Sequence, residues 1–151
     1  MKTVVVLIVA SLISSAAHAQ ARDVWTFDQL VAKADCVVIG EVVGTKETGR
    51  AAHPDLKYPA VQFDTEFKVQ TTLKPCGSAG ATGTAVHLKY YAPDFERLQQ
   101  GVIPSDSVLN FVDGNTYLLF LKRTNGAEYE PLSGNTWPTM SVYPLLKPGE
   151  R

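Results

Sequence analysis

The stretch VQFDTEFKVQTTL, residues 61–73, alternates between two kinds of side chain without a break. One face carries apolar side chains and threonines: Val61, Phe63, Thr65, Phe67, Val69, Thr71 and Leu73. The other face carries polar and charged side chains. A period of two residues predicts a β-strand with one buried face. At about 3.3 Å per residue the strand is long for a flat small sheet, and its length favours a sheet coiled into a barrel.

Further strands are predicted on both sides of this stretch. Residues 35–44 (DCVVIGEVVG) are apolar on both faces, as expected of a strand that is covered on both sides. Residues 84–91 and 116–123 predict two more strands. The pair Asn125-Gly126 is a hairpin signal before a fifth short strand. Residues 136–145 allow one edge segment that is interrupted by prolines.

A short helix is predicted over residues 27–34. Thr26 is a suitable N-cap, and Gln29 follows at the spacing of a capping box. Trp25 and Leu30 occupy the two positions of a hydrophobic staple. Together with the five strands, this helix indicates a small antiparallel barrel or sandwich. Strands that are apolar on both faces need an outer cover, and the helix and the tail around Trp137 can provide it.

The N-terminus has the pattern of a secretory signal peptide. Lys2 precedes the apolar run Val4–Ile13, and Ala17-His18-Ala19 is a small-x-small cleavage site. An uncleaved membrane anchor is the alternative, but the run is short for a bilayer core of about 30 Å. We therefore predict a signal peptide at 1–19 and a single domain at 20–151 that is secreted or periplasmic. No stable membrane insertion is expected after cleavage.

The charge balance gives no reason to expect nucleic acid as a partner. The chain has 14 Lys and Arg residues against 15 Asp and Glu residues, a formal charge of −1, and loss of Lys2 makes this −2. Binding to a phosphate backbone needs a cluster of basic residues, and none is present in the sequence. We therefore predict no nucleic-acid partner.

Four segments together resemble a known group of folds. They are ADCVVIGEVVG (34–44), FDTEFKVQTTLKPCG (63–77), VHLKYYAP (86–93) and DGNTYLLFLKR (113–123). In order and pattern they are similar to the strands of the netrin-like, TIMP-like OB-fold group, and most similar to its secreted bacterial members of uncharacterised function. The resemblance covers roughly residues 26–134. It implies a mainly β fold, a small antiparallel five-stranded OB-like barrel with a short N-terminal helix.

The chain departs from this group at the position that matters for inhibition. Animal members that inhibit metalloproteases use a cysteine at the mature N-terminus to reach the catalytic zinc. Here the mature chain is expected to begin at Gln20, and the first cysteine is Cys36. That mechanism therefore does not carry over, although a looser protein-binding or inhibitor-like role is compatible with the fold.

The two cysteines predict a disulfide. In an oxidising compartment an even pair of cysteines favours a disulfide over a catalytic or metal-binding set. If residues 35–44 and 61–73 pair antiparallel, Cys36 lies opposite roughly Val69 to Leu73, and a bend at Pro75 brings Cys76 within reach. The glycines that follow Cys76 lack the Gly-Lys-Ser/Thr ending of a phosphate-binding loop, so they predict a flexible turn.

The sequence has no motif that organises a catalytic or metal site. Outside the signal peptide the histidines are His53 and His87, without the paired spacing of metal ligands. No Gly-x-Ser-x-Gly elbow or cysteine–histidine signature is present. We therefore expect no metal, no cofactor and no enzyme activity. A small exported hydrolase and a carrier of a small apolar ligand remain the alternatives.

The segment YYAPDFERLQQGVIP, residues 90–104, is the best binding candidate in the sequence. It joins the third and fourth predicted strands, and its residues are of types enriched at interface hot spots. The candidate protein-binding residues are Tyr90, Tyr91, Phe95, Arg97 and, in the tail, Trp137. The alternative is that Tyr90 and Phe95 pack the mouth of the barrel and that Trp137 covers its outside. The predicted partner is another exported protein.

Overall fold

The computed structural model describes residues 24–51, 53–56, 58–77, 80–99, 108–125, 128–135 and 137–145. The expected signal peptide and the expected start at Gln20 lie outside these residues. The described elements are α1 (Phe27–Lys33), β1 (Cys36–Ala51), β2 (Ala60–Lys74), β3 (Ala85–Pro93), β4 (Thr116–Arg123), β5 (Glu128–Pro131), the 3-10 helix η1 (Pro138–Ser141) and β6 (Val142–Leu145).

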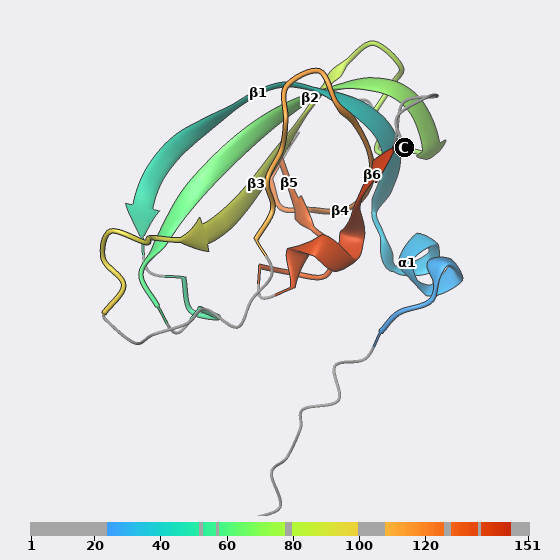
Figure 1. The fold of residues 1–151 in the computed structure, drawn as a ribbon. Coiled ribbons are helices and arrows are strands. Elements are labelled where there is room, and N and C mark those ends of the chain that lie inside the picture. Colours follow the sequence, from blue (N-terminus) through green and yellow to red (C-terminus); the bar gives the residue numbers. More distant parts are fainter. Residues whose placement is uncertain are drawn as a thin grey trace, which may run out of the picture.

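Five strands close into a barrel. They follow the order β1-β2-β3-β5-β4, β4 pairs back to β1, and β6 extends the sheet beyond β4 (Figure 1). The predicted mainly β fold with a five-stranded OB-like barrel and a short N-terminal helix is confirmed. The expectation that every pair is antiparallel is wrong for β3 and β5, which are parallel. The reason is topological, because an odd number of strands in a closed ring cannot alternate in direction at every pair.

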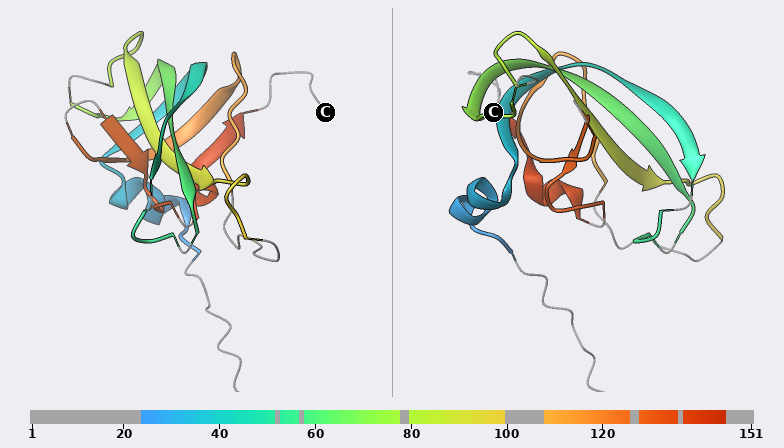
Figure 2. Two further views of the ribbon diagram at one scale, coloured as in Figure 1. Left: turned by 90° about the vertical axis from the view of Figure 1, so that its left-hand side faces the viewer. Right: turned by 180° about the vertical axis from the view of Figure 1, so that it is seen from behind.

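β1 and β2 run well past the ring of the barrel. β1 pairs with β4 only over Cys36–Glu41, but it pairs with β2 from Val37 to Ala51. Together with β3, the two long strands form a curved sheet that extends to one side, as Figures 1 and 2 show from three directions. The far end of this sheet, where Ala60 pairs with Pro93, lies beyond the residues of β1 and β3 that pair with β4 and β5 in the ring.

The alternation of β2 separates inside from outside as predicted. Val61, Thr65, Phe67 and Val69 are buried, and the polar residues between them lie on the outer face. The pattern fails near the end of β2, where Leu73 is 55% exposed. Apolar side chains from all five strands fill the interior, with Tyr129, Phe67, Leu88 and Leu119 among the largest. β2 therefore supplies one wall of a solid core.

The helix forms where it was predicted, with both hydrogen bonds of the capping box between Thr26 and Gln29. Its buried face covers the outside of the barrel. Leu30 and Ala34 pack against Val37 and Phe120, which point out of the ring. The expectation of an outer cover for the doubly apolar strands is confirmed for the helix.

Lys74, at the end of β2, fastens this helix to the sheet. Its Nζ atom donates hydrogen bonds to the carbonyl oxygens of Val31 (2.9 Å), Ala32 (3.2 Å) and Ala34. A cation at the C-terminal end of a helix also interacts favourably with the helix dipole. The last residue of β2, which continues the polar outer face of the strand, thus caps α1.

Candidate functional site

The two cysteines form the predicted disulfide. Cys36 and Cys76 are bonded, with a Cα–Cα distance of 4.6 Å, and both are buried in the core. The carbonyl oxygen of Cys76 accepts hydrogen bonds from Tyr129 Oη (3.1 Å) and from Arg123. A Cβ atom at Gly80 would overlap the side chain of Cys76, so Gly80, four residues after the cysteine, has a packing role. This end of the barrel therefore has a structural disulfide in place of a reactive thiol.

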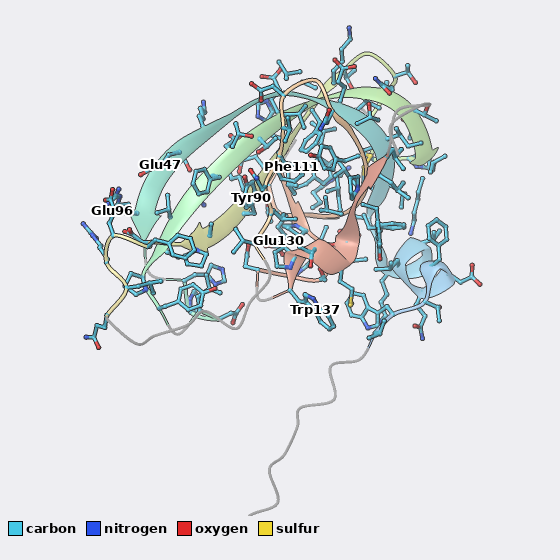
Figure 3. All side chains as sticks on the ribbon, viewed as in Figure 1. Glu47, Tyr90, Glu96, Phe111, Glu130 and Trp137 are labelled. Carbon is cyan, nitrogen blue, oxygen red and sulfur yellow. A yellow bond between two sulfur atoms is a disulfide. The ribbon has the colours of Figure 1, made fainter. Side chains whose placement is uncertain are left out.

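Tyr90 lies inside the barrel, unlike the other candidate binding residues. It is 3% exposed and lies between Phe63 and Phe111, with ring centroids 5.6 and 5.4 Å away (Figure 3). Burial raises the pKa of Tyr90, and a hydrogen bond to Thr65 partly opposes that shift. The packing alternative holds for Tyr90, since β3 alternates and residue 90 falls on its inner face. A partner cannot reach this ring in the closed barrel.

Phe95, by contrast, is 69% exposed on a turn that follows β3. The amides of Arg97 and Leu98 both donate to the carbonyl oxygen of Asp94 at 3.0 Å, which forms a single helical turn. The amide of Asp94 donates to Pro59, so the turn is also fixed to the start of β2. The packing alternative therefore fails for Phe95, because nothing in the described residues covers most of its ring.

The backbone of Asp94 anchors this turn, and its side chain is a buried carboxylate whose Oδ2 atom makes no hydrogen bond within the described residues. Asp94 is 2% exposed, and its Oδ2 atom lies 3.6 Å from Arg50 Nη1 and 3.6 Å from Arg97 Nε. Arg50 also pairs with Glu96 at 2.8 Å and with Glu47 at 3.4 Å. The hydrogen bond to Glu96, followed by the one to Glu47 and the charge of Asp94, raises the pKa of Arg50. We call this turn, residues 94–98, the Phe95 turn.

Tyr91 and Trp137 are half-buried and lie in different places. The Tyr91 ring packs against His53 with centroids 4.6 Å apart, and its hydroxyl accepts a hydrogen bond from Gln62. Trp137 precedes η1, below the barrel in Figure 3 and far from Glu96 of the Phe95 turn. The five candidate residues thus do not form one surface, and only Phe95 and Arg97 are exposed together.

The sequence did not single out a groove on the outer face of β1, β2 and β3. Its first part is a hollow of about 250 Å³ lined by Val43, Gly44, Thr45, Lys46, Asp64, Glu66 and His87. Gly44 lies opposite Glu66 in the sheet and leaves the floor open, because it has no side chain there. A second hollow of about 180 Å³ shares Val43 and Glu66 and continues to Lys68 and Gly83–Ala85. We call the two hollows together the outer groove.

His87 pairs with Asp64 in the outer groove. Nδ1 of His87 lies 3.1 Å from Oδ1 of Asp64, and the Asp64 side chain is only 13% exposed. An ionised carboxylate can only accept, so Nδ1 carries the hydrogen-bonded proton. This is the geometry of a base and its orienting acid, but the described residues that line the groove include no serine or cysteine. The sequence analysis considered His87 only as a possible metal ligand and did not identify this carboxylate partner.

One signal for this groove was present in the sequence. The polar face of residues 61–73 carries three charged side chains at alternate positions, Asp64, Glu66 and Lys68. What the sequence left open was the neighbour of each residue. The register shows Lys46 and Lys89 beside Asp64, and His87 beside Glu66.

Other site types find no support among the described residues. There, no group of three or more His, Cys, Asp or Glu side chains is arranged to hold a metal ion. No helix in the same ranges is long and apolar enough to cross a membrane. Comparison with families of known proteins finds none that matches the chain, and comparison with curated proteins finds no match either.

Proposed function

We propose that this protein is an exported, non-catalytic β-barrel domain that binds another protein through the Phe95 turn. The observation that carries the proposal is the exposure of Phe95 on a turn anchored by the buried Asp94. A large apolar ring in water costs free energy, and the fold does not use this ring for its own core.

The anchoring of the turn supports a binding role. Residues that dominate protein interfaces are mostly aromatic or arginine side chains. Binding is stronger when such residues are already held in position, because less conformational entropy is lost. Phe95 and Arg97 satisfy both conditions, since Arg97 stands 61% exposed on the same turn with Asp94 as its partner.

The filled interior favours protein binding over the carrier alternative. Side chains of the barrel strands occupy the inside of the ring, and several of the largest are fully buried. A carrier of a small apolar ligand needs a cavity of several hundred Å³ instead. The netrin-like, TIMP-like resemblance remains a prediction that agrees with a binding or inhibitor-like module.

Partner capture tests this proposal. The protein without residues 1–19 would be immobilised and exposed to the exported proteins of its source, beside an otherwise identical Phe95→Ala protein. We expect at least one protein that is retained by the wild type and lost from the variant. If no such protein appears and the purified domain instead turns over a substrate, the hydrolase alternative replaces the proposal.

A further inference from the structure

We propose that the partner protein adds an extended segment to the side of β1 that faces away from β2, along residues 43–50, with an acidic residue of the segment opposite Lys46. The inference rests on the proposed protein-binding function and names the form of the partner. It follows from the pairing of β1 and from a row of charges that ends at this side of the strand.

β1 has no neighbour on one side after it leaves the ring. β4 pairs with β1 only as far as Glu41, and Val42 makes the last two backbone hydrogen bonds to the segment before β4, both at 2.9 Å. β2 continues to pair with the other side of β1 as far as Ala51. Within the described residues, no strand and no backbone hydrogen bond reaches residues 43–50 from the side away from β2 (Figure 1). We call this side of residues 43–50 the open edge.

The open edge offers backbone hydrogen bonds to a partner. Alternate residues of an antiparallel strand direct their N–H and C=O groups to each side, so the open edge carries donors and acceptors that an added strand can bond. Its eight residues span up to about 23 Å at about 3.3 Å per residue. Bulges at Val43 and Thr48 leave residues 44–47 as a regular stretch between them. The hydroxyl of Thr48 donates to Gln62 of β2 at 3.1 Å, so this side chain does not cover the open edge.

A row of charges crosses the sheet and ends at the open edge. Lys89 lies opposite Asp64, and Asp64 lies opposite Lys46, so the three side chains share the outer face and alternate in sign. Lys89 is paired with Glu128 at 2.6 Å, whereas the ammonium group of Lys46 has no hydrogen-bond or ion-pair partner in the described part of the chain. An acidic residue on an added strand would continue the alternation, because opposite charges on directly opposed residues stabilise a pair of strands.

The same charges disfavour a second copy of this chain as the occupant. A two-fold antiparallel pair centred on Lys46 would place two lysines opposite each other, and a pair centred on Glu47 would place two glutamates opposite each other. Like charges in that position are destabilising. Charged side chains and bulges on an edge strand also protect it from pairing with its own copies. The occupant that fits is therefore a segment of a different protein.

The open edge lies beside the Phe95 turn. Arg50, at the end of the open edge, contacts the residues on both sides of Phe95, at 3.6 and 2.8 Å. Glu47 of β1 pairs with the same guanidinium, and Figure 3 shows Glu47 and Glu96 at the same end of the sheet. One partner can thus contact Phe95 with one part and add a strand to β1 with another.

Three peptides test the backbone and the charge separately. The probe is acetyl-Thr-Val-Glu-Val-Thr-amide, in which the glutamate and the threonines share one face of a strand and the valines share the other. The second peptide has lysine in place of the glutamate. The third is the probe with its three central amides N-methylated, which removes backbone donors but retains every side chain.

Each peptide would be titrated into the nitrogen-15-labelled protein at about 20 mM salt, where screening is weak. We expect the probe to shift amide signals and slow hydrogen exchange mainly in residues 43–50. The lysine peptide should bind with a dissociation constant about fivefold higher, the effect of one reversed cross-strand charge pair. The N-methylated peptide should cause no shifts.

Two lysines supply matched variants. Lys46 and Lys68 are both exposed and lack a partner among the described residues, but Lys68 lies on β2, away from the open edge. We expect Lys46→Gln to abolish the preference for the glutamate peptide and Lys68→Gln to retain it. Equal binding of the glutamate and lysine peptides by the wild type, binding of the N-methylated peptide, or shifts on another surface would overturn the inference. Slow exchange of consecutive amides in residues 43–50 of the free protein would also overturn it, because the edge would then already be covered by this chain or by a second copy.

The outcome is separable from that of the proposed function. Peptide binding to the open edge does not depend on Phe95, so the Phe95→Ala protein should respond to the probe as the wild type does. If the peptides fail while a captured protein is still lost from Phe95→Ala, the open edge is refuted as a site and the Phe95 turn stands. If the probe binds but no protein depends on Phe95, the open edge stands and the proposed use of the Phe95 turn is refuted.

Discussion

Arg50 Nη1, near the end of β1, lies 3.6 Å from the buried carboxylate of Asp94. This ion pair connects β1 to the turn that carries Phe95. The same guanidinium pairs with the exposed Glu96, so one cation contacts a buried and an exposed acid. The two acids therefore allow a matched comparison of what holds the turn.

Asp94→Asn should lower the free energy of unfolding by about 1 to 3 kcal/mol, since it removes a buried charge that two arginines approach. Glu96→Gln removes one charge from the same cluster but at a site where the side chain is 75% exposed. Its effect should be below about 1 kcal/mol. Urea unfolding of both variants measures the difference. Equal losses would show that Asp94 is not the anchor of the turn.

Lys74→Met should loosen α1, because it keeps the side-chain length but removes the donor to the three carbonyl oxygens at the end of the helix. We expect a loss of about 1 to 2 kcal/mol and faster hydrogen exchange in the helix. The control is Lys68→Met on the same strand, where the ammonium group has no partner among the described residues. Unchanged exchange in α1 after Lys74→Met would contradict the capping role.

The disulfide should be present in the isolated protein and should matter for stability. Cys36 and Cys76 are 40 residues apart, and closing a loop of that length constrains the unfolded chain by about 4 kcal/mol. Reduction should therefore lower the free energy of unfolding by about that amount. Thiol titration of the unreduced, denatured protein should detect no free thiol. Two free thiols would contradict the assignment.

The burial of Tyr90 predicts a loss of stability in alkaline solution. Burial raises the pKa of Tyr90 above its ordinary value of 10 in the folded protein. Above pH 10 the unfolded chain thus loses a proton that the folded protein retains, so the free energy of unfolding falls as pH rises. Denaturant unfolding between about pH 9 and 11 should give a shallower decline for Tyr90→Phe than for the wild type. An equally steep decline of the free energy of unfolding in both proteins would contradict the role of Tyr90.

Local patterns in the sequence were sufficient to predict the barrel and its disulfide. The alternation at 61–73 depends on neighbours two residues apart, and the capping box at Thr26 depends on residues three apart. Cys36 and Cys76 met because long antiparallel strands leave few registers open to them. The parallel pairing of β3 with β5 was missed, since it follows from how the ring closes and not from any local signal.

The candidate site was predicted only in part, for a related reason. Tyr90 and Tyr91 are adjacent in sequence but face opposite sides of β3, so Tyr90 lies in the core and Tyr91 lies on the outer side. The exposure of Phe95 depends on Asp94 reaching Arg50, which is more than forty positions away in the chain. The outer groove depends on Gly44 lying opposite Glu66 across two strands. Such cross-strand neighbours cannot be deduced from one strand alone.

The central claim is that Phe95 anchors a protein partner, and the dissociation constant of the captured complex tests it most directly. Phe95→Ala should weaken binding by roughly thirtyfold, the effect of losing about 2 kcal/mol at a hot spot. Leu73→Ala removes a similarly exposed apolar side chain at the opposite end of β2 and should leave the constant unchanged. If Phe95→Ala binds as tightly as the wild type, the account of the Phe95 turn is wrong.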